Sequence, residues 1–143
     1  MSTMSPQVCL LTSEQIAEYW DRIEWRLDET PSMQRFYTKE DIIDQICKQE
    51  MQVWTAGMDL VLITQVLTVP IGKVLQIVWA HGEGLDAHFA ELLDKFHTFA
   101  WTQECIKIEI LGRPGWERKF REQIGFKVEY VAYSADVMKP RMH

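Results

Sequence analysis

The sequence predicts an α+β fold in a single domain, with a central, mostly antiparallel mixed sheet flanked by helices. Two amphipathic helix patterns open the chain, three apolar strand patterns follow, and the chain closes on helix–strand–helix–strand. With 143 residues, 47% of them hydrophobic, the chain can bury a core of its own. We expect the order ααβββαβαβ in one domain over 1–143, with an N-terminal extension over 1–11 and a C-terminal tail over 138–143.

The first helix pattern starts with a capping-box motif, in which Thr12 is the N-cap and Gln15 reaches back to it. Apolar residues then recur at helical spacing until Thr30 and Pro31, where a helix must stop. A second helix is expected to begin at Thr38. The residues expected to be buried by the two helices are Ile16, Trp20, Ile23, Leu27, Ile42, Ile43, Ile46 and Cys47.

Three strands are predicted in the middle of the chain. Residues 52–56 and 60–67 form a hairpin through the turn at 57–59. A second turn at 69–72 contains proline and glycine and leads into a strand over 73–80.

The remaining elements alternate between helix and strand. After the loop 81–84, a helix is predicted over 86–101, and the Ile-rich run 105–111 is expected to be an interior strand. A short helix from Pro114 to Gly125 and a last strand over 128–137 complete the pattern.

Composition and charge exclude several function classes. The formal net charge of -6 argues against binding nucleic acid by phosphate neutralisation and against a polybasic membrane-surface role. The apolar stretch 60–80 is interrupted by Pro70, Gly72 and Lys73, so no membrane span is expected. The first residues carry no secretory signal pattern.

Neither the cysteines nor the histidines suggest a metal or disulfide framework. The three cysteines are widely spaced, and we expect reduced, buried thiols in a cytosolic protein. His81 and His88 lie near Glu83 and Asp86, but their spacing matches no zinc motif, so no metal site is predicted. The cysteines are Cys9, Cys47 and Cys105.

The strand–loop–helix unit around Gly82 and Gly84, followed later by Gly125 and Phe126, resembles the GNAT acetyltransferase family, and the resemblance covers Thr12 to Val137. It implies acetyl-CoA as a cofactor, with phosphates bound by backbone N–H groups at a helix N-terminus. The residues that this implies for cofactor binding are Gly82, Gly84, Asp86 and Ala87.

The sequence departs from the family pattern at the residues that carry chemistry. In the phosphate-loop pattern Gln/Arg-x-x-Gly-x-Gly/Ala, Trp79 occupies the Gln/Arg position and Glu83 adds negative charge. If the family pattern is instead aligned on Leu92 and Leu93 of the following helix, its small-residue positions fall on 87–89. The position of the family's general-acid tyrosine is Arg121. Catalytic residues therefore stay unassigned, with Glu83 and Arg121 as candidates. Glu109 and Asp86 are further carboxylates available as a base.

A narrower resemblance is to small GNAT-like proteins encoded by tailed bacteriophages and prophages, some of which are virion components. It rests on 52–54, 64–84, 100–101 and 108–116, and its most specific piece is the Gly-Arg-Pro-Gly-Trp element at 112–116. It implies other virion proteins, or further copies of this chain, as partners. Arg113 and Trp116 are candidates for a contact patch, because Arg and Trp are enriched at interface hot spots.

Two function classes follow from the sequence. It favours a non-catalytic virion or assembly protein without a cofactor, located in the particle or the host cytoplasm, which would expose an aromatic patch. The candidates for that patch are Trp20, Trp25, Trp79 and Trp116. The alternative is an active N-acetyltransferase acting on a host protein or small amine, with a cleft between 73–80 and 105–111.

Overall fold

The structure is a computed structural model and describes residues 7–29, 37–57, 59–110, 127 and 135–140. The chain divides into two compact units, Met1–Leu111 and Gly112–His143. Within the described residues, all helices and strands belong to the first unit. The predicted helix from Pro114 to Gly125 lies outside the described residues. The domain boundaries given above stay a prediction.

A five-stranded sheet forms the centre of the first unit, with its strands in the order β1-β2-β3-β4-β5. β1 to β4 pair antiparallel, whereas β5 pairs parallel with β4. The predicted mixed, mostly antiparallel sheet is therefore confirmed. The strands are β1 (Cys9–Leu10), β2 (Met51–Ala56), β3 (Leu60–Val69), β4 (Gly72–His81) and β5 (Cys105–Ile110).

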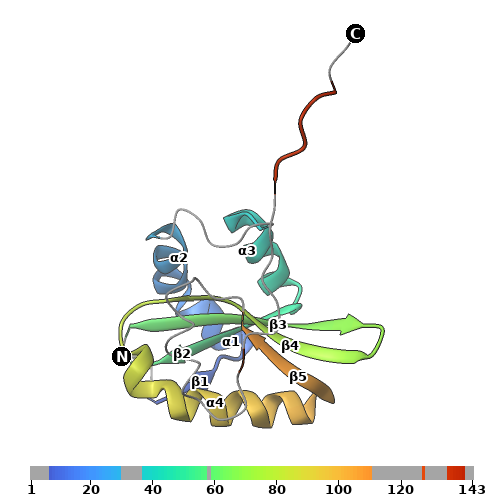
Figure 1. Ribbon diagram of the computed structural model, residues 1–143. Coiled ribbons are helices and arrows are strands. Elements are labelled where there is room, and N and C mark those ends of the chain that lie inside the picture. Colours follow the sequence, from blue (N-terminus) through green and yellow to red (C-terminus); the bar gives the residue numbers. More distant parts are fainter. Residues whose placement is uncertain (1–6, 30–36, 58, 111–126, 128–134, 141–143) are drawn as a thin grey trace. The chain divides into compact units, whose positions relative to one another are not determined.

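Helices cover both faces of this sheet. Figure 1 shows α2 and α3 on one side and α4 on the other, which confirms the α+β class. None of the described helices is long and apolar enough to cross a membrane. The helices are α1 (Ser13–Glu18), α2 (Trp20–Glu29), α3 (Lys39–Cys47) and α4 (Leu85–Thr102).

The two predicted helix starts are confirmed by their caps. Thr12 Oγ1 accepts from the backbone N–H of Gln15 at 3.2 Å, and Gln15 Oε1 accepts from the N–H of Thr12 at 2.9 Å. Thr38 and Asp41 exchange the same pair of bonds at 3.1 and 3.0 Å. Each box satisfies two backbone donors that a helix N-terminus leaves without an intrahelical acceptor.

Several predictions about local structure were wrong. The first predicted helix is two helices, because it breaks at Tyr19, and β1 falls in the stretch expected to be an extension. Of the predicted last strand, residues 128–134 lie outside the described residues, and 135–137 are not in a strand. The expected burial of the cysteines also fails, since Cys47 is exposed and Cys9 and Cys105 are half-buried.

Each face of the sheet has its own hydrophobic core, as the alternation of side chains along strands requires. The core on the α4 side contains Trp54, whose ring meets Phe96 and Phe99 edge-on at 4.8 and 5.5 Å between centroids. The core on the α2 and α3 side includes Val53, Val61, Ile63, Val78 and Trp79, with Tyr37 packed against it. The polar side chains described next are on this second face.

Candidate functional site

At the junction between β4 and α4, glycines leave the backbone uncovered by side chains. Gly84 is the N-cap of α4 with a left-handed φ of 99°, and no side chain caps the helix. The first bond of the helix runs from the N–H of His88 to the carbonyl of Gly84 at 3.1 Å. The N–H groups of Leu85 and Ala87 therefore have no carbonyl partner within the helix, and they point toward its N-terminal end. Such an end favours an anionic ligand.

Gly82 has a packing reason to be glycine. Its φ is 119°, and a Cβ built on it would lie 2.1 Å from the backbone oxygen of Asp59. The loop after β4 is thus pressed directly against the hairpin that joins β2 and β3. On the other side of this loop, the ring of His88 lies so close to Gly57 that a Cβ there would be 2.9 Å from Nε2.

An ion pair holds this hairpin from the side of α2. The buried guanidinium of Arg26 pairs with the carboxylate of Asp59, and it lies 4.3 Å from the ring centroid of Trp25. Because the backbone of Asp59 also touches Gly82, α2, the hairpin and the loop before α4 form one contact series.

β4 is irregular next to this loop. Ile63 pairs with Trp79 and Thr64 pairs with Ile77, so Val78 is the extra residue of a β-bulge. Pairing with the described part of β5 ends just before the bulge, at Ile77 and Ile110. Bulges re-aim side chains and are over-represented beside active sites. Since β4 and β5 are parallel, their carboxyl ends lie at the same edge as the start of α4.

A row of hydrogen-bonded polar side chains crosses three strands on the α2 and α3 face. Gln65 Nε2 donates to Tyr37 Oη at 3.3 Å and to Gln76 Oε1 at 2.7 Å, and Gln76 Nε2 donates to Glu109 Oε1 at 2.7 Å. The two glutamines are 4% and 8% exposed, whereas Tyr37 and Glu109 are half-buried. We call Tyr37, Gln65, Gln76 and Glu109 the polar row.

The polar row ends on a carboxylate that its neighbours hold in place. From Gln65 to Gln76 and from Gln76 to Glu109 the donors run in one direction, so that each of these two bonds polarises the next, while Gln65 also donates to Tyr37 at the other end of the row. Strand register fixes this geometry, because Gln65 pairs with Gln76 and Gln76 pairs with Glu109. Glu109 is thus a half-buried carboxylate held at a defined position on the parallel strand pair.

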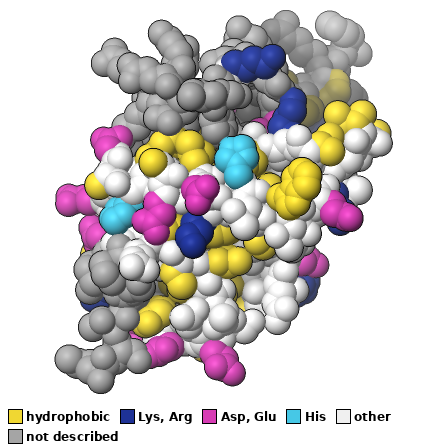
Figure 2. Space-filling model, turned by 90° about the horizontal axis from the view of Figure 1, so that it is seen from below, with side chains coloured by type: hydrophobic (Ala, Val, Ile, Leu, Met, Phe, Trp, Pro, Cys, Tyr) yellow, Lys and Arg dark blue, Asp and Glu magenta, His cyan; other side chains and the backbone are white. Residues whose placement is uncertain are grey.

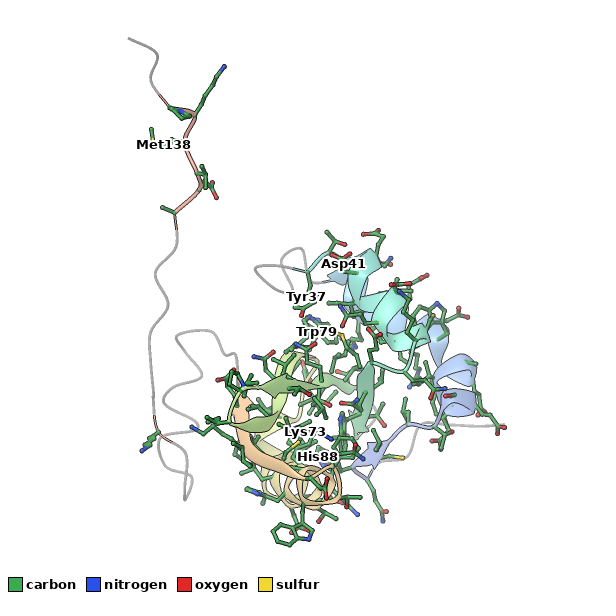
Figure 3. All side chains as sticks on the ribbon, turned by 90° about the vertical axis from the view of Figure 1, so that its right-hand side faces the viewer. Tyr37, Asp41, Lys73, Trp79, His88 and Met138 are labelled. Atoms are coloured by element: carbon green, nitrogen blue, oxygen red, sulfur yellow. The ribbon has the colours of Figure 1, made fainter. Side chains whose placement is uncertain are left out.

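On the same face lies Trp79, which is 4% exposed and whose indole Nε1 has no hydrogen-bond partner among the residues that the structure describes. Its ring stacks on His81 at 5.9 Å between centroids, with 20° between the planes. Figure 3 shows Tyr37 and Trp79 close together on the side of the sheet where α3 lies. The prediction that Trp79 belongs to an exposed patch is wrong, because the bulge turns it into the core.

The structure brings some of the predicted site residues together and leaves others apart. The four cofactor candidates lie at the β4–α4 junction, where Asp86 and Ala87 are exposed on the first turn of the helix. Glu83 is exposed in the preceding loop. The remaining candidates, Arg113, Trp116 and Arg121, lie outside the described residues.

Sequence reasoning weighed Glu109 but missed its partners. Gln65 and Gln76 each stand on a strand of mostly apolar residues, at positions whose side chains are buried. That signal is readable in the sequence, since a polar residue on an apolar strand face needs a partner when buried. The identity of the partner required the strand register.

Charge near the α4 N-terminus is negative rather than positive. Asp86 is the charged residue of the first turn of the helix, and Glu83 precedes it. On the face seen in Figure 2, acidic side chains are interspersed with apolar ones, and the described surface there forms no continuous basic field. An anion at this end would thus depend on backbone N–H groups. Within the described ranges, no group of three or more His, Cys, Asp or Glu gathers as metal ligands would.

Comparison with known proteins yields structural likeness only. No family model matches the sequence, and no curated protein matches it. Solved acetyltransferase structures, however, match nearly the whole chain. The ribosomal-protein-alanine N-acetyltransferase of Brucella melitensis biovar Abortus 2308 matches with a TM-score of 0.63 and 16% identity, covering 92% of this chain and 99% of that one.

Two further matches are enzymes with other substrates in their names. An aminoglycoside acetyltransferase from an uncultured soil metagenomic sample, in complex with sisomicin, has a TM-score of 0.67 and 11% identity, covering 93% of this chain and 96% of its own. Glucosamine-6-phosphate N-acetyltransferase from Arabidopsis thaliana has a TM-score of 0.61 and 10% identity, covering 91% and 97%. These likenesses show that the chain has the fold of the GNAT acetyltransferases.

Proposed function

We propose that this protein is an acyl-CoA-dependent N-acyltransferase in which Glu109 accepts a proton from a primary amine. The observation that carries the proposal is the polar row, which holds this carboxylate by a 2.7 Å bond from Gln76. Glu109 stands one residue before the end of the described part of β5, and the N-terminus of α4 lies at the same edge of the sheet. A base and an anion-binding helix end thus share one region.

The residues at the β4–α4 junction fit the phosphates of a coenzyme A ester. The N–H groups of Leu85 and Ala87 have no acceptor within the helix, and the glycine N-cap leaves them open to a ligand. Because Asp86 and Glu83 bring negative charge, we expect weaker phosphate binding than at a helix end with basic neighbours. The coenzyme supplies an acyl group activated as a thioester.

The proposed transfer uses two proton steps. Glu109 takes one proton from the bound ammonium, and the neutral amine nitrogen then attacks the thioester carbonyl carbon. The new C–N bond forms as the C–S bond breaks, the second proton passes from nitrogen to the departing thiolate, and Glu109 releases its proton to water. The products are an amide and free coenzyme A, so atoms and charges balance.

Calorimetry with acetyl-CoA and a turnover assay that follows the release of free thiol test this proposal. We expect acetyl-CoA to bind and a primary amine to be acetylated. Glu109→Gln keeps an oxygen to accept from Gln76 but cannot take up a proton, so it should lower kcat by about 100-fold or more and leave acetyl-CoA binding unchanged. The matched control is Glu104→Gln, an exposed position just before β5. Absence of acetyl-CoA binding in the wild-type protein would refute the proposal.

A second candidate function is the one that the sequence favours, a non-catalytic virion or assembly protein. Its support is exposed apolar surface, namely Trp101 at 84% and Ile71 at 79% exposure. Ile71 lies beside Gly72, and a Cβ on Gly72 would be 3.0 Å from Ile106, which is 56% exposed. Ile71 and Ile106 therefore form one exposed apolar end of the sheet.

Self-association through that end is measurable by sedimentation velocity. If the second candidate holds, the wild-type protein forms oligomers, and Ile71→Glu combined with Ile106→Glu returns it to the monomer. Glu91→Gln on α4 serves as the control for a surface change elsewhere. A wild-type protein that stays monomeric at all concentrations would remove self-association from this candidate.

A further inference from the structure

We propose that the indole N–H of Trp79 recognises the acyl acceptor, by donating a hydrogen bond to a neutral oxygen that lies next to the acceptor's amine. The inference rests on the proposed function and deepens it, because it names the chemical class of the acceptor. That class is a primary amine with a neighbouring hydroxyl or carbonyl oxygen.

The first observation is that Trp79 is buried at 4% exposure while its Nε1 has no hydrogen-bond partner within the described part of the chain. A buried indole normally finds an acceptor, since leaving a buried donor unpaired is unfavourable. A group of this kind inside a native fold calls for an explanation, and a bound ligand is one. A ligand that brings an oxygen to Nε1 would remove this penalty on binding.

The second observation is the position of Trp79 relative to the polar row. Trp79 pairs with Ile63 and Gln76 pairs with Gln65, so the two side chains are on one face of β4, with the bulge residue Val78 between them. Gln76 in turn bonds to Glu109. The unpartnered donor and the held carboxylate are therefore on the same face of adjacent strands, and one small molecule can meet both.

The third observation is the chemistry of the two groups. An ionised carboxylate selects a cationic amine, whereas an indole N–H can only donate and selects a neutral oxygen rather than a second cation. An amino amide and an amino sugar both satisfy these requirements, whereas a simple alkylamine satisfies only the first.

Two-dimensional ¹H–¹⁵N spectroscopy tests the inference without relying on turnover. The wild-type protein has six tryptophans and therefore six indole N–H signals. The signal of Trp79 is the one that is missing from the spectrum of Trp79→Phe. If that variant does not fold, triple-resonance experiments assign the signal instead. With coenzyme A present, millimolar glycinamide or glucosamine should move the Trp79 indole proton downfield. Ethylamine, which lacks the oxygen, should leave it in place. The indole signal of the exposed Trp101 is the internal control.

The outcomes separate this inference from the proposed function. A Trp79 signal that does not move with glycinamide or glucosamine, or that moves equally with ethylamine, overturns the inference even if acetyl-CoA binds. A selective shift without acetyl-CoA binding keeps Trp79 as a donor to the oxygen of an amine ligand, but it removes the acyltransferase and with it the role of that ligand as acyl acceptor. The two oxygen-bearing probes also tell an amino amide from an amino sugar. In turnover, Trp79→Phe should raise KM for the preferred probe roughly five- to tenfold, which is a larger rise than the rise in KM for ethylamine.

Discussion

Gln76 and Glu109 face each other across the parallel strand pair β4–β5, and Gln76 Nε2 donates to Glu109 Oε1 at 2.7 Å. The same glutamine accepts from Gln65, so its amide joins a buried antiparallel pair to a half-buried carboxylate. A change at Gln76 therefore affects both the stability of the sheet and the carboxylate to which we assign proton transfer.

Gln76→Leu should destabilise the fold by about 1–3 kcal/mol, because the buried amide of Gln65 loses its shorter hydrogen bond and keeps only the 3.3 Å bond to Tyr37, while Glu109 loses this donor. Urea unfolding measures the loss. Gln103→Leu, at the exposed C-cap of α4, is the matched control and should stay within about 0.5 kcal/mol of wild type. Equal stability of the two variants would mean that the polar row contributes nothing.

Gly82→Ala should destabilise the protein by at least about 2 kcal/mol, because the new Cβ would lie 2.1 Å from the oxygen of Asp59. Gly84→Ala is the control, since its φ is also positive but its nearest neighbour would be His88 at 3.3 Å. The difference between the two variants isolates the contact with Asp59 from backbone strain. Thermal unfolding that ranks Gly84→Ala as the worse variant would contradict this packing.

Thr38→Ala should destabilise the protein by about 1 kcal/mol, because it removes the side-chain acceptor for the N–H of Asp41. Tyr37 directly precedes this cap and belongs to the polar row, so fraying of α3 should also reach Gln65. The control is Thr98→Ala within α4, whose hydroxyl only bonds back to the carbonyl of Asp94. Urea unfolding should show no loss for that control.

Cys105 should react with iodoacetamide more slowly than Cys47 at about pH 8, because the thiolate is the reacting form. Burial raises the pKa of the Cys105 thiol, an effect that nearby Lys73 partly offsets, whereas Cys47 is exposed. The folded thiol thus ionises at higher pH than the unfolded one, and its contribution to stability is lost as pH rises through the folded pKa. Mass spectrometry of the alkylated peptides would contradict this if Cys105 were modified first.

Local sequence signals determined most of the elements. Both capping boxes, the hairpin after Ala56, the turn at Pro70 and the long helix α4 depend on residues within a few positions of one another, and each is present. The break at Tyr19 and the two-residue strand β1 escaped prediction. The first divides one continuous apolar pattern, and the second exists only because β2 pairs with it.

The candidate site depended on tertiary structure. Nothing local to Gln65, Gln76 or Glu109 says that they meet, because they are brought together by strand register across 33 positions of sequence between Gln76 and Glu109. The burial of Trp79 likewise depends on a bulge, which shifts side chains to the other face by one residue. Sequence patterns with short range thus determined the helices and strands, whereas long-range pairing decided which polar groups share a site.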